Sequence, residues 1–165
     1  MHDKKVGKRT RAVLWHKDPK GIKFLIGLRQ YDNANGKLNI FLLPGGGVDE
    51  GESLIAGCVR EIHEEIGATI QHLEYIGMIN SPWKPHPVLV EHYGTSWDTD
   101  IDELYVYKGF YNGKVTDKEP HKWGFYGFVT MVELEAMLVE QNKTTETILG
   151  GKVREILSMC EVLST

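Results

Sequence analysis

The sequence predicts a mixed α/β fold in which a mixed β-sheet lies between helical layers. Strand-like segments occur before and after one strongly patterned central helix, and further helices close the chain. The 165 residues, 41% hydrophobic and 25% charged, suffice for one ordinary core. We therefore expect a single domain over residues 1–165.

The segments before the central helix alternate between apolar strands and polar turns. Residues 10–16 (TRAVLWH) and 22–29 (IKFLIGLR) are expected to form a hairpin, because Pro and Gly punctuate residues 17–21 (KDPKG). Residues 31–39 are polar and turn-rich, which predicts an exposed loop before a strand at residues 40–43.

The segments after the central helix are predicted from their apolar periodicity and from turn residues. Alternation predicts strands at residues 70–80, 88–93, 103–111 and 123–131. A period near 3.6 predicts helices at residues 133–140 and 147–163.

Three glutamates give residues 45–68 the most informative pattern of the chain. If residues 53–66 form a helix, Glu61, Glu64 and Glu65 stand at i, i+3 and i+4 and share an arc of about 100°. Carboxylates this close repel one another, and a divalent cation would reverse the repulsion. Hard oxygen ligands suit Mg²⁺, with Mn²⁺ as a substitute. A solvated, Glu-rich helix face is the alternative.

A glycine-rich loop leads into this helix. Pro44 gives a stiff stop after a buried strand, and Gly45, Gly46 and Gly47 leave the backbone free to approach a phosphate or a metal ion closely. The predicted apolar stripe of the helix consists of Leu54, Ile55, Cys58, Val59, Ile62 and Ile66. Glu61 and Glu65 lie on its shoulder, where the helix meets the rest of the protein.

The net charge of −4 is unevenly distributed. Residues 1–30 carry nine Lys or Arg, whereas residues 49–103 carry twelve Asp or Glu. This predicts either an anion-binding rim beside a cation-binding floor or ordinary solvated surface. The basic cluster of Lys4, Lys5, Lys8 and Arg9 lacks interleaved aromatic residues, so we do not expect a nucleic acid as a partner.

The two cysteines, Cys58 and Cys160, are expected to be reduced thiols in the core, which favours a cytoplasmic location. No segment approaches the roughly eighteen apolar residues that a membrane span needs, so no membrane association is expected.

Gly46, five residues, Glu52, seven residues and then residues 60–68 (REIHEEIGA) resemble the signature of the Nudix hydrolases. Each fixed Gly, Glu and Arg of that signature is present at the right spacing, and Ala68 replaces the larger aliphatic residue that usually closes it. The resemblance implies a Nudix α/β/α sandwich. It also implies Mg²⁺-dependent cleavage of the pyrophosphate bond in a nucleoside diphosphate linked to another group.

The resemblance further implies roles for individual residues. Glu61, Glu64 and Glu65 would bind the metal ion with the carbonyl of Gly45. Arg60 would hold a signature carboxylate such as Glu52, for which capping of the helix is the structural alternative. The substrate-binding candidates are Arg29, Gly46 and Gly47; for Arg29, a surface ion pair is the alternative to a phosphate contact.

The sequence does not determine which residue acts as the general base. It is Glu61 or Glu64 within the signature, or Glu119 from a later loop, with Glu91 and Glu103 as weaker candidates.

Loops outside the signature are expected to determine which substrate the protein recognises. A (d)NTP or small nucleotide-sugar pyrophosphatase is our first expectation. The alternatives are a dinucleoside polyphosphate hydrolase, a non-catalytic nucleotide sensor and a Nudix-fold isomerase that uses a cysteine. The sequence also leaves open whether the protein forms a homodimer. Candidate base-stacking side chains, with packing as their alternative role, are Trp83, His86, His92, Tyr93 and Trp97.

Overall fold

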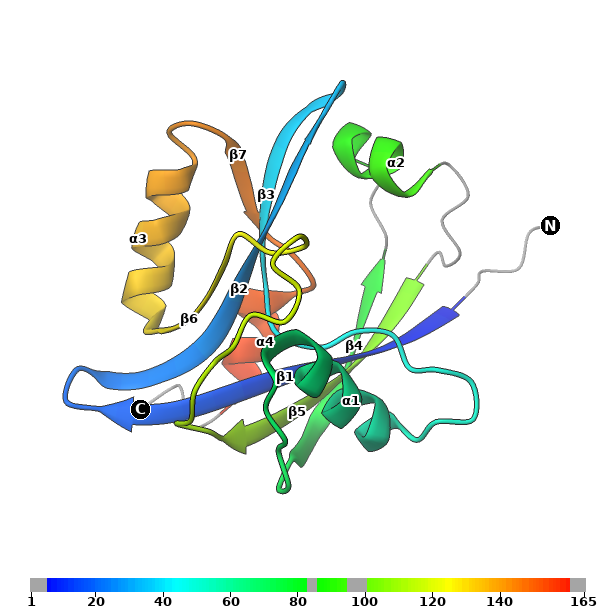
Figure 1. The fold of residues 1–165 in the computed structure, drawn as a ribbon, viewed down its shortest axis with the longest axis vertical. Coiled ribbons are helices and arrows are strands. Elements are labelled where there is room, and N and C mark those ends of the chain that lie inside the picture. The colour runs from blue at the N-terminus through cyan, green and yellow to red at the C-terminus, as the bar shows by residue number, and fades with distance from the viewer. Residues whose placement is uncertain (1–5, 83–85, 95–100, 161–165) are drawn as a thin grey trace.

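The computed structural model describes residues 6–82, 86–94 and 101–160, which form a mixed sheet with helices on both faces (Figure 1). In chain order the elements are β1 (Val6–Asp18), β2 (Gly21–Asn33), β3 (Gly36–Leu42), α1 (Leu54–Ile66), β4 (Glu74–Pro82), α2 (Pro87–Tyr93), β5 (Ile101–Phe110), β6 (Phe125–Val129), α3 (Met131–Gln141), β7 (Glu146–Leu149) and α4 (Val153–Met159). The strand order is β4-β5-β1-β2-β3-β7, and β6 pairs with β2. The β1–β5 and β3–β7 pairs are parallel and the other pairs are antiparallel, so the expected mixed sheet is confirmed.

The polar segment at residues 31–39 forms a hairpin, and the prediction of an exposed loop there was wrong. β2 continues to Asn33 and β3 begins at Gly36. Tyr31 lies opposite Leu38 in the register, and both side chains are buried against Val88 of α2. Burial of alternate residues therefore outweighs the polarity of the residues between them.

Residues 88–93 form a helix, not the predicted strand. Pro87 occupies the first helical turn, and the Nδ1 atom of His86, the N-cap, accepts a hydrogen bond from the backbone N–H of Val88 at 3.2 Å. Proline at this position and a capping side chain favour a helix start. The β-branched run favoured the strand only through local propensity.

Residues 147–163 do not form one helix as predicted. Residues 146–149 are the strand β7, and α4 begins only at Val153, after a turn at Gly150 and Gly151. Gly151 has a φ of +56°, a conformation that breaks a helix. Residues 161–163 of the predicted helix lie outside the described residues.

Two apolar clusters fix the helices to opposite faces of the sheet. Cys58, Ile62 and Ile66 of α1 pack with Ala12, Leu14 and Leu25 on one face. Leu134 of α3 and Val153, Ile156 and Leu157 of α4 pack with Val13, Phe24 and Ile26 on the other. Alternate side chains of β1 and β2 therefore pack on opposite faces of the sheet. Ile55, which was expected in the apolar stripe of α1, is 45% exposed.

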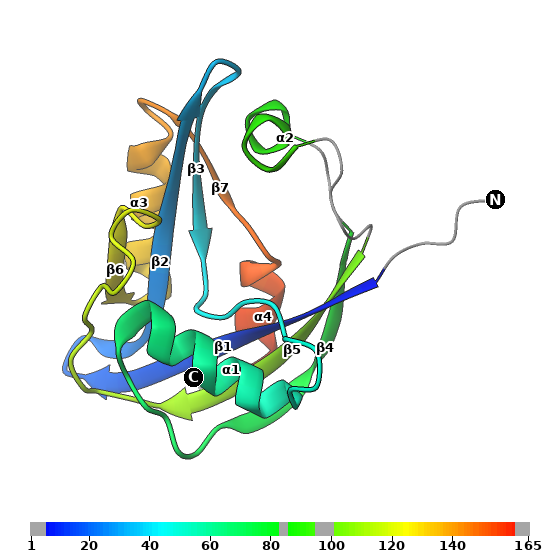
Figure 2. The same ribbon diagram turned by 45° about the vertical axis from the view of Figure 1, so that its right-hand side comes forward.

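The sheet opens into two wings next to the N-terminus of β1. β1 pairs with β2 only near their hairpin turn, from Trp15–Phe24 to Asp18–Gly21. Away from this turn β1 continues beside β5 and β4, whereas β2 continues beside β3 and β7 (Figure 2). The edge of β1 that β2 leaves free is available to another segment.

Cys58 and Cys160 are free and buried. Burial raises the pKa of both thiols, to about 12 for Cys58. Of the helices in the described ranges, none has the length and apolar character that a membrane span requires.

Truncation of the α1 side chain in the core should destabilise the fold strongly. Ile62 is fully buried, so Ile62→Ala is expected to lower the free energy of unfolding by about 2–5 kcal/mol through lost burial and an unfilled cavity. Ile55→Ala, on the exposed side of the same helix, should change it by less than about 0.5 kcal/mol. Urea denaturation of both variants measures the difference, and equal losses would contradict this packing of α1.

Candidate functional site

The glycine loop occupies the edge of β1 that β2 leaves free. The backbone N–H groups of Thr10 and Ala12 donate to the carbonyls of Gly46 and Pro44, both at 2.8 Å. Gly45 between them has a φ of +142°, and a Cβ at this position would lie 2.0 Å from the carbonyl oxygen of Thr10. Only glycine fits here, because any side chain would push the loop off the strand.

The helix α1 begins and ends with well-formed caps. The Oγ of Ser53, the N-cap, accepts a hydrogen bond from the N–H of Ala56 at 3.2 Å. Gly67 ends the helix in the left-handed conformation and donates its N–H to the carbonyl of His63 at 2.9 Å. Ser53 therefore takes the capping role that was the structural alternative for Glu52.

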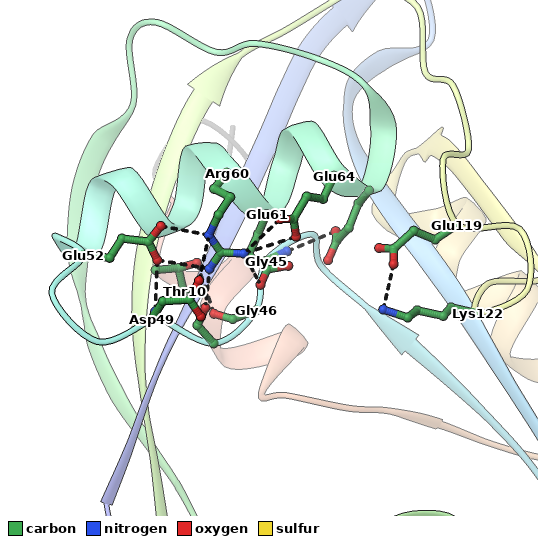
Figure 3. Close-up of polar contacts among 12 residues, drawn as sticks. Thr10, Gly45, Gly46, Asp49, Glu52, Arg60, Glu61, Glu64, Glu119 and Lys122 are labelled. Carbon is green, nitrogen blue, oxygen red and sulfur yellow. Dashed lines mark hydrogen bonds and ion pairs between the residues drawn. The ribbon is translucent and has the colours of Figure 1, made fainter.

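Arg60 connects three signature glutamates and the glycine loop (Figure 3). Its Nε and Nη2 donate to the two carboxylate oxygens of Glu52 at 2.8 and 3.0 Å, and Nη2 also donates to the carbonyl of Gly47 at 2.9 Å. Nη1 donates to Glu61 at 3.2 Å and to Glu64 at 3.1 Å. These contacts raise the pKa of Arg60, and the hydrogen bonds from Arg60 lower the pKa of Glu52.

Glu65 is a buried carboxylate whose hydrogen-bond donors are neutral. It is 4% exposed, and its Oε2 accepts from the N–H of Gly45 at 3.3 Å and from the hydroxyl of Tyr126 at 3.2 Å. Burial raises its pKa to about 8, although the positive charge of Arg11 opposes the shift. Burial also raises the pKa of Glu61, against the effect of Arg60. Both carboxylates are therefore poorly compensated when ionised.

A cleft of about 190 Å³ brings most of the predicted site residues together. Its lining consists of Arg9, Arg11, Arg29, Leu42, Leu43, Gly45, Gly46, Gly47, Glu61, Glu65, Glu119, Lys122 and Trp123. Glu64 and Arg60 instead line a hollow on the outer side of α1 with Ile55 and Val59. The side chain of Glu64 is half exposed and directed to Arg60.

Within the described residues Arg29 contacts aromatic rings and forms no surface ion pair, which was its alternative. Its guanidinium carbon lies 5.3 Å from the ring centre of Trp123 and 5.9 Å from that of Tyr31. Both distances are within the range of cation–π attraction. The charged group is thus positioned at the cleft.

Four residues of the cleft with charged or aromatic side chains were not predicted as site residues from the sequence: Arg9, Arg11, Lys122 and Trp123. Arg11 had a recognisable signal, because it lies within the predicted strand TRAVLWH, directly before the apolar run AVLW, and an arginine is rarely buried without a special environment. Burial lowers its pKa, while Glu65 and Glu61 act in the opposite direction. Lys122 and Trp123 carried no pattern that distinguishes them from other loop residues.

The loop that carries Glu119 is fixed to the end of α1. The N–H groups of Thr116 and Lys118 donate to the carbonyls of Ile66 and Glu65, both at 3.1 Å. Glu119 itself makes an ion pair of 2.7 Å with Lys122 (Figure 3). Glu119 is also among the residues that line the cleft, which makes it the candidate base from outside the signature that reaches the site.

The other two candidate bases lie elsewhere. Glu91 on α2 accepts a hydrogen bond from the N–H of Asn35 at 3.1 Å, and Glu103 on β5 accepts one from the hydroxyl of Tyr105 at 3.1 Å. Neither is among the residues that line the cleft.

The candidate base-stacking residues are not part of this cleft where they are described. His86 caps α2 and contacts Glu146 at 3.0 Å, and the ring of His92 packs against Tyr31. The hydroxyl groups of Tyr93 and Tyr31 are 2.9 Å apart. Trp83 and Trp97 lie outside the described residues.

The donor chemistry of the site fits a hard divalent cation. As placed in the described part of the chain, no three His, Cys, Asp or Glu side chains form a ready metal-binding group. Arg60, however, already supplies positive charge between Glu61 and Glu64, and the donors to buried Glu65 from the described residues, Gly45 and Tyr126, are neutral. The carbonyl of Gly45 lies in the chain between those of Pro44 and Gly46, which accept hydrogen bonds from β1. Glu61, Glu64, Glu65 and this carbonyl are the groups that could hold a cation.

Comparison with known proteins agrees with this geometry. The family model of the NUDIX domain matches residues 8–148, and the chain therefore belongs to the Nudix family. Membership of this family makes the chain a Nudix pyrophosphohydrolase that acts on nucleoside diphosphate derivatives. A search of curated proteins found no match.

Several solved structures share the fold. A MutT protein from Methanosarcina mazei Go1 is 25% identical, with a TM-score of 0.56 over 84% of this chain and 85% of that chain. An Ap4A hydrolase from C. elegans is 18% identical, with a TM-score of 0.55 over 96% and 95%. The NUDIX domain of NrtR from Shewanella oneidensis, in complex with ADP ribose, is 16% identical, with a TM-score of 0.55 over 87% and 88%.

The raised pKa of Glu65 predicts a stability that falls with pH in the absence of metal. The folded protein keeps a proton to about pH 8, whereas the unfolded chain releases it near the ordinary value of 4.5, so stability is lost as the pH rises between these values. Glu65→Gln cannot ionise and can keep an oxygen for Gly45 and Tyr126. In EDTA it should melt several degrees above the wild-type protein at about pH 8 and closer to it at about pH 5. Thermal melts at both pH values test this, and a pH-independent difference would contradict it.

Proposed function

We propose that the protein is a Mg²⁺-dependent pyrophosphatase of a (d)NTP or a small nucleotide sugar. The observation that carries this proposal is the lining of the cleft, where carboxylates and cationic side chains face the same small space. Pockets that enclose a whole drug-sized ligand measure roughly 300–1,000 Å³. At about 190 Å³ the cleft suits the phosphate chain of a nucleotide, while the nucleoside would remain outside it.

The carboxylates would supply the cation site. Glu61, Glu64 and Glu65, with the carbonyl of Gly45, would hold Mg²⁺, and Mn²⁺ has the ligand preference to replace it. The bound ion would neutralise charge on the pyrophosphate oxygens and so permit attack by water. Arg60 would then serve as a positioning residue that fixes Glu52 and the carbonyl of Gly47.

Glu119 is the general base that we favour. It lines the cleft, Lys122 fixes its carboxylate, and its loop is hydrogen-bonded to the helix that carries the other glutamates. Glu61 and Glu64 would instead be occupied as ligands of the cation, which would leave them less free to accept a proton from water. Arg29, Gly46 and Gly47 would contact the phosphate chain from the remaining walls.

Two of the alternative functions fit the chain less well. A cysteine-dependent isomerase needs an accessible thiol, whereas Cys58 is fully buried and its pKa is raised to about 12. A non-catalytic sensor has no need of the complete signature that this chain retains. The free cysteines also support our proposal of a cytoplasmic location.

Hydrolysis should depend on Glu64. With Mg²⁺ and a panel of (d)NTPs, nucleotide sugars and dinucleoside polyphosphates, Glu64→Gln should lower kcat by about 100-fold or more, because a bound cation contributes several kcal/mol to the transition state. Glu140→Gln, an exposed glutamate paired with Lys143, is the matched control and should retain full activity. Release of phosphate or pyrophosphate measures both. Binding of a nucleotide without turnover by the wild-type protein would support the sensor and overturn the enzyme.

Loss of the proposed base should affect turnover and not affinity. Glu119→Gln is expected to reduce kcat by about 10²–10⁴-fold with little change in KM. Lys122→Met, which removes the partner of Glu119 but not the base, should have a smaller effect on kcat. Steady-state kinetics of the two variants measure these effects. If Glu119→Gln remains active, the general base is Glu61 or Glu64.

A further inference from the structure

The side chain of Arg11 lies inside the protein without a full set of hydrogen bonds. Arg11 is 9% exposed, and its Nη1 donates to the carbonyl of Thr10 at 3.0 Å. Its Nε is buried and has no hydrogen-bond partner, which holds for no other buried side-chain nitrogen or oxygen within residues 6–82, 86–94 and 101–160. A buried donor without an acceptor destabilises the folded state. An acceptor that binds there would remove this penalty.

The fold keeps space for this guanidinium at the wall of the cleft. Arg9 and Arg11 are two residues apart on β1, so both lie on the face that lines the cleft. Gly151 also approaches this side chain, because a Cβ at Gly151 would lie 3.3 Å from Nε and 3.8 Å from Nη2 of Arg11. A side chain at this turn would press on the guanidinium, and glycine leaves it room to move.

The other cationic side chains of the cleft already have partners. The Nε of Arg9 lies 3.1 Å from Asp102, and Lys122 pairs with Glu119. Arg29 lies over the ring of Trp123. Among the cations that line the cleft, Arg11 is the one with a buried donor, Nε, that has no acceptor within the described residues.

We propose that Arg11 binds the pyrophosphate group of the substrate, with Nε and a neighbouring Nη donating to its non-bridging oxygens. The planar fork of a guanidinium matches a phosphoryl group in shape and charge. In this arrangement β1 holds the anion while α1 holds the cation, and the two walls act on the same anhydride. The inference rests on the proposed function and adds to it an anion-binding residue outside the Nudix signature.

Inorganic pyrophosphate is the probe that tests this role without turnover of a nucleotide. Calorimetric titration in Mg²⁺ and again in EDTA should show that Arg11→Met binds pyrophosphate about 10–100-fold more weakly than the wild-type protein in both buffers. Arg11→Lys keeps the charge but not the fork, so its affinity should lie between the two. Arg154→Met removes an arginine that is exposed on α4 and paired with Glu135, and it should bind like the wild-type protein.

The melting temperature separates a binding role from a structural one. Because Arg11→Met replaces a buried donor that has no acceptor, this variant should melt at or above the wild-type temperature in EDTA. Unchanged pyrophosphate affinity in Arg11→Met, or a clear loss of its thermal stability, would show the inference to be wrong. Arg11-dependent binding of pyrophosphate by a protein that hydrolyses no nucleotide would overturn only the proposed function.

Discussion

The site depends on the close contact between the glycine loop and β1. Two backbone hydrogen bonds from Thr10 and Ala12 hold the loop along a strand edge that would otherwise be unpaired. The contact requires glycine at position 45, since a Cβ there would lie 2.0 Å from the carbonyl oxygen of Thr10 and no side chain fits. The same loop directs the N–H of Gly45 to Glu65 and the carbonyl of Gly47 to Arg60. One stretch of backbone therefore sets the positions of the acidic helix and of the basic strand relative to each other.

Charge and burial oppose each other in this region, and Arg60 relieves only part of the conflict. It donates hydrogen bonds to Glu52, Glu61 and Glu64, whereas Glu65 receives neutral donors. On the opposite side, Arg11 is buried with an unsatisfied Nε. Poorly compensated groups of both signs at one cleft reduce the stability of the ligand-free protein. Such a cost is common where a protein is shaped to bind charged ligands and not for maximal stability.

The parts of the molecule that the sequence predicted well are those determined locally. Ser53, the apolar repeat of Ile62 and Ile66, and Gly67 set the bounds of α1. The resemblance to the Nudix signature implied that Arg60 holds a carboxylate such as Glu52, and the structure contains this contact. Helix α2 was missed because a cap and a proline outweighed β-branched side chains, and β7 because pairing with β3, distant in the chain, outweighed helical periodicity. The inclusion of Arg11 and Lys122 in the cleft depends on long-range pairing of β1 and on a loop, neither of which has a sequence period.

The attachment of the Glu119 loop to α1 limits how the site can move. The N–H groups of Thr116 and Lys118 satisfy carbonyls in the last turn of α1, so this loop acts as the C-terminal cap of the helix as well as a wall of the cleft. If it swung outward as a lid, two carbonyls beside the buried carboxylate of Glu65 would lose their partners. Exchange of ligands at the cleft is thus coupled to fraying of the helix end, and hydrogen exchange at Thr116 and Lys118 would report the motion directly.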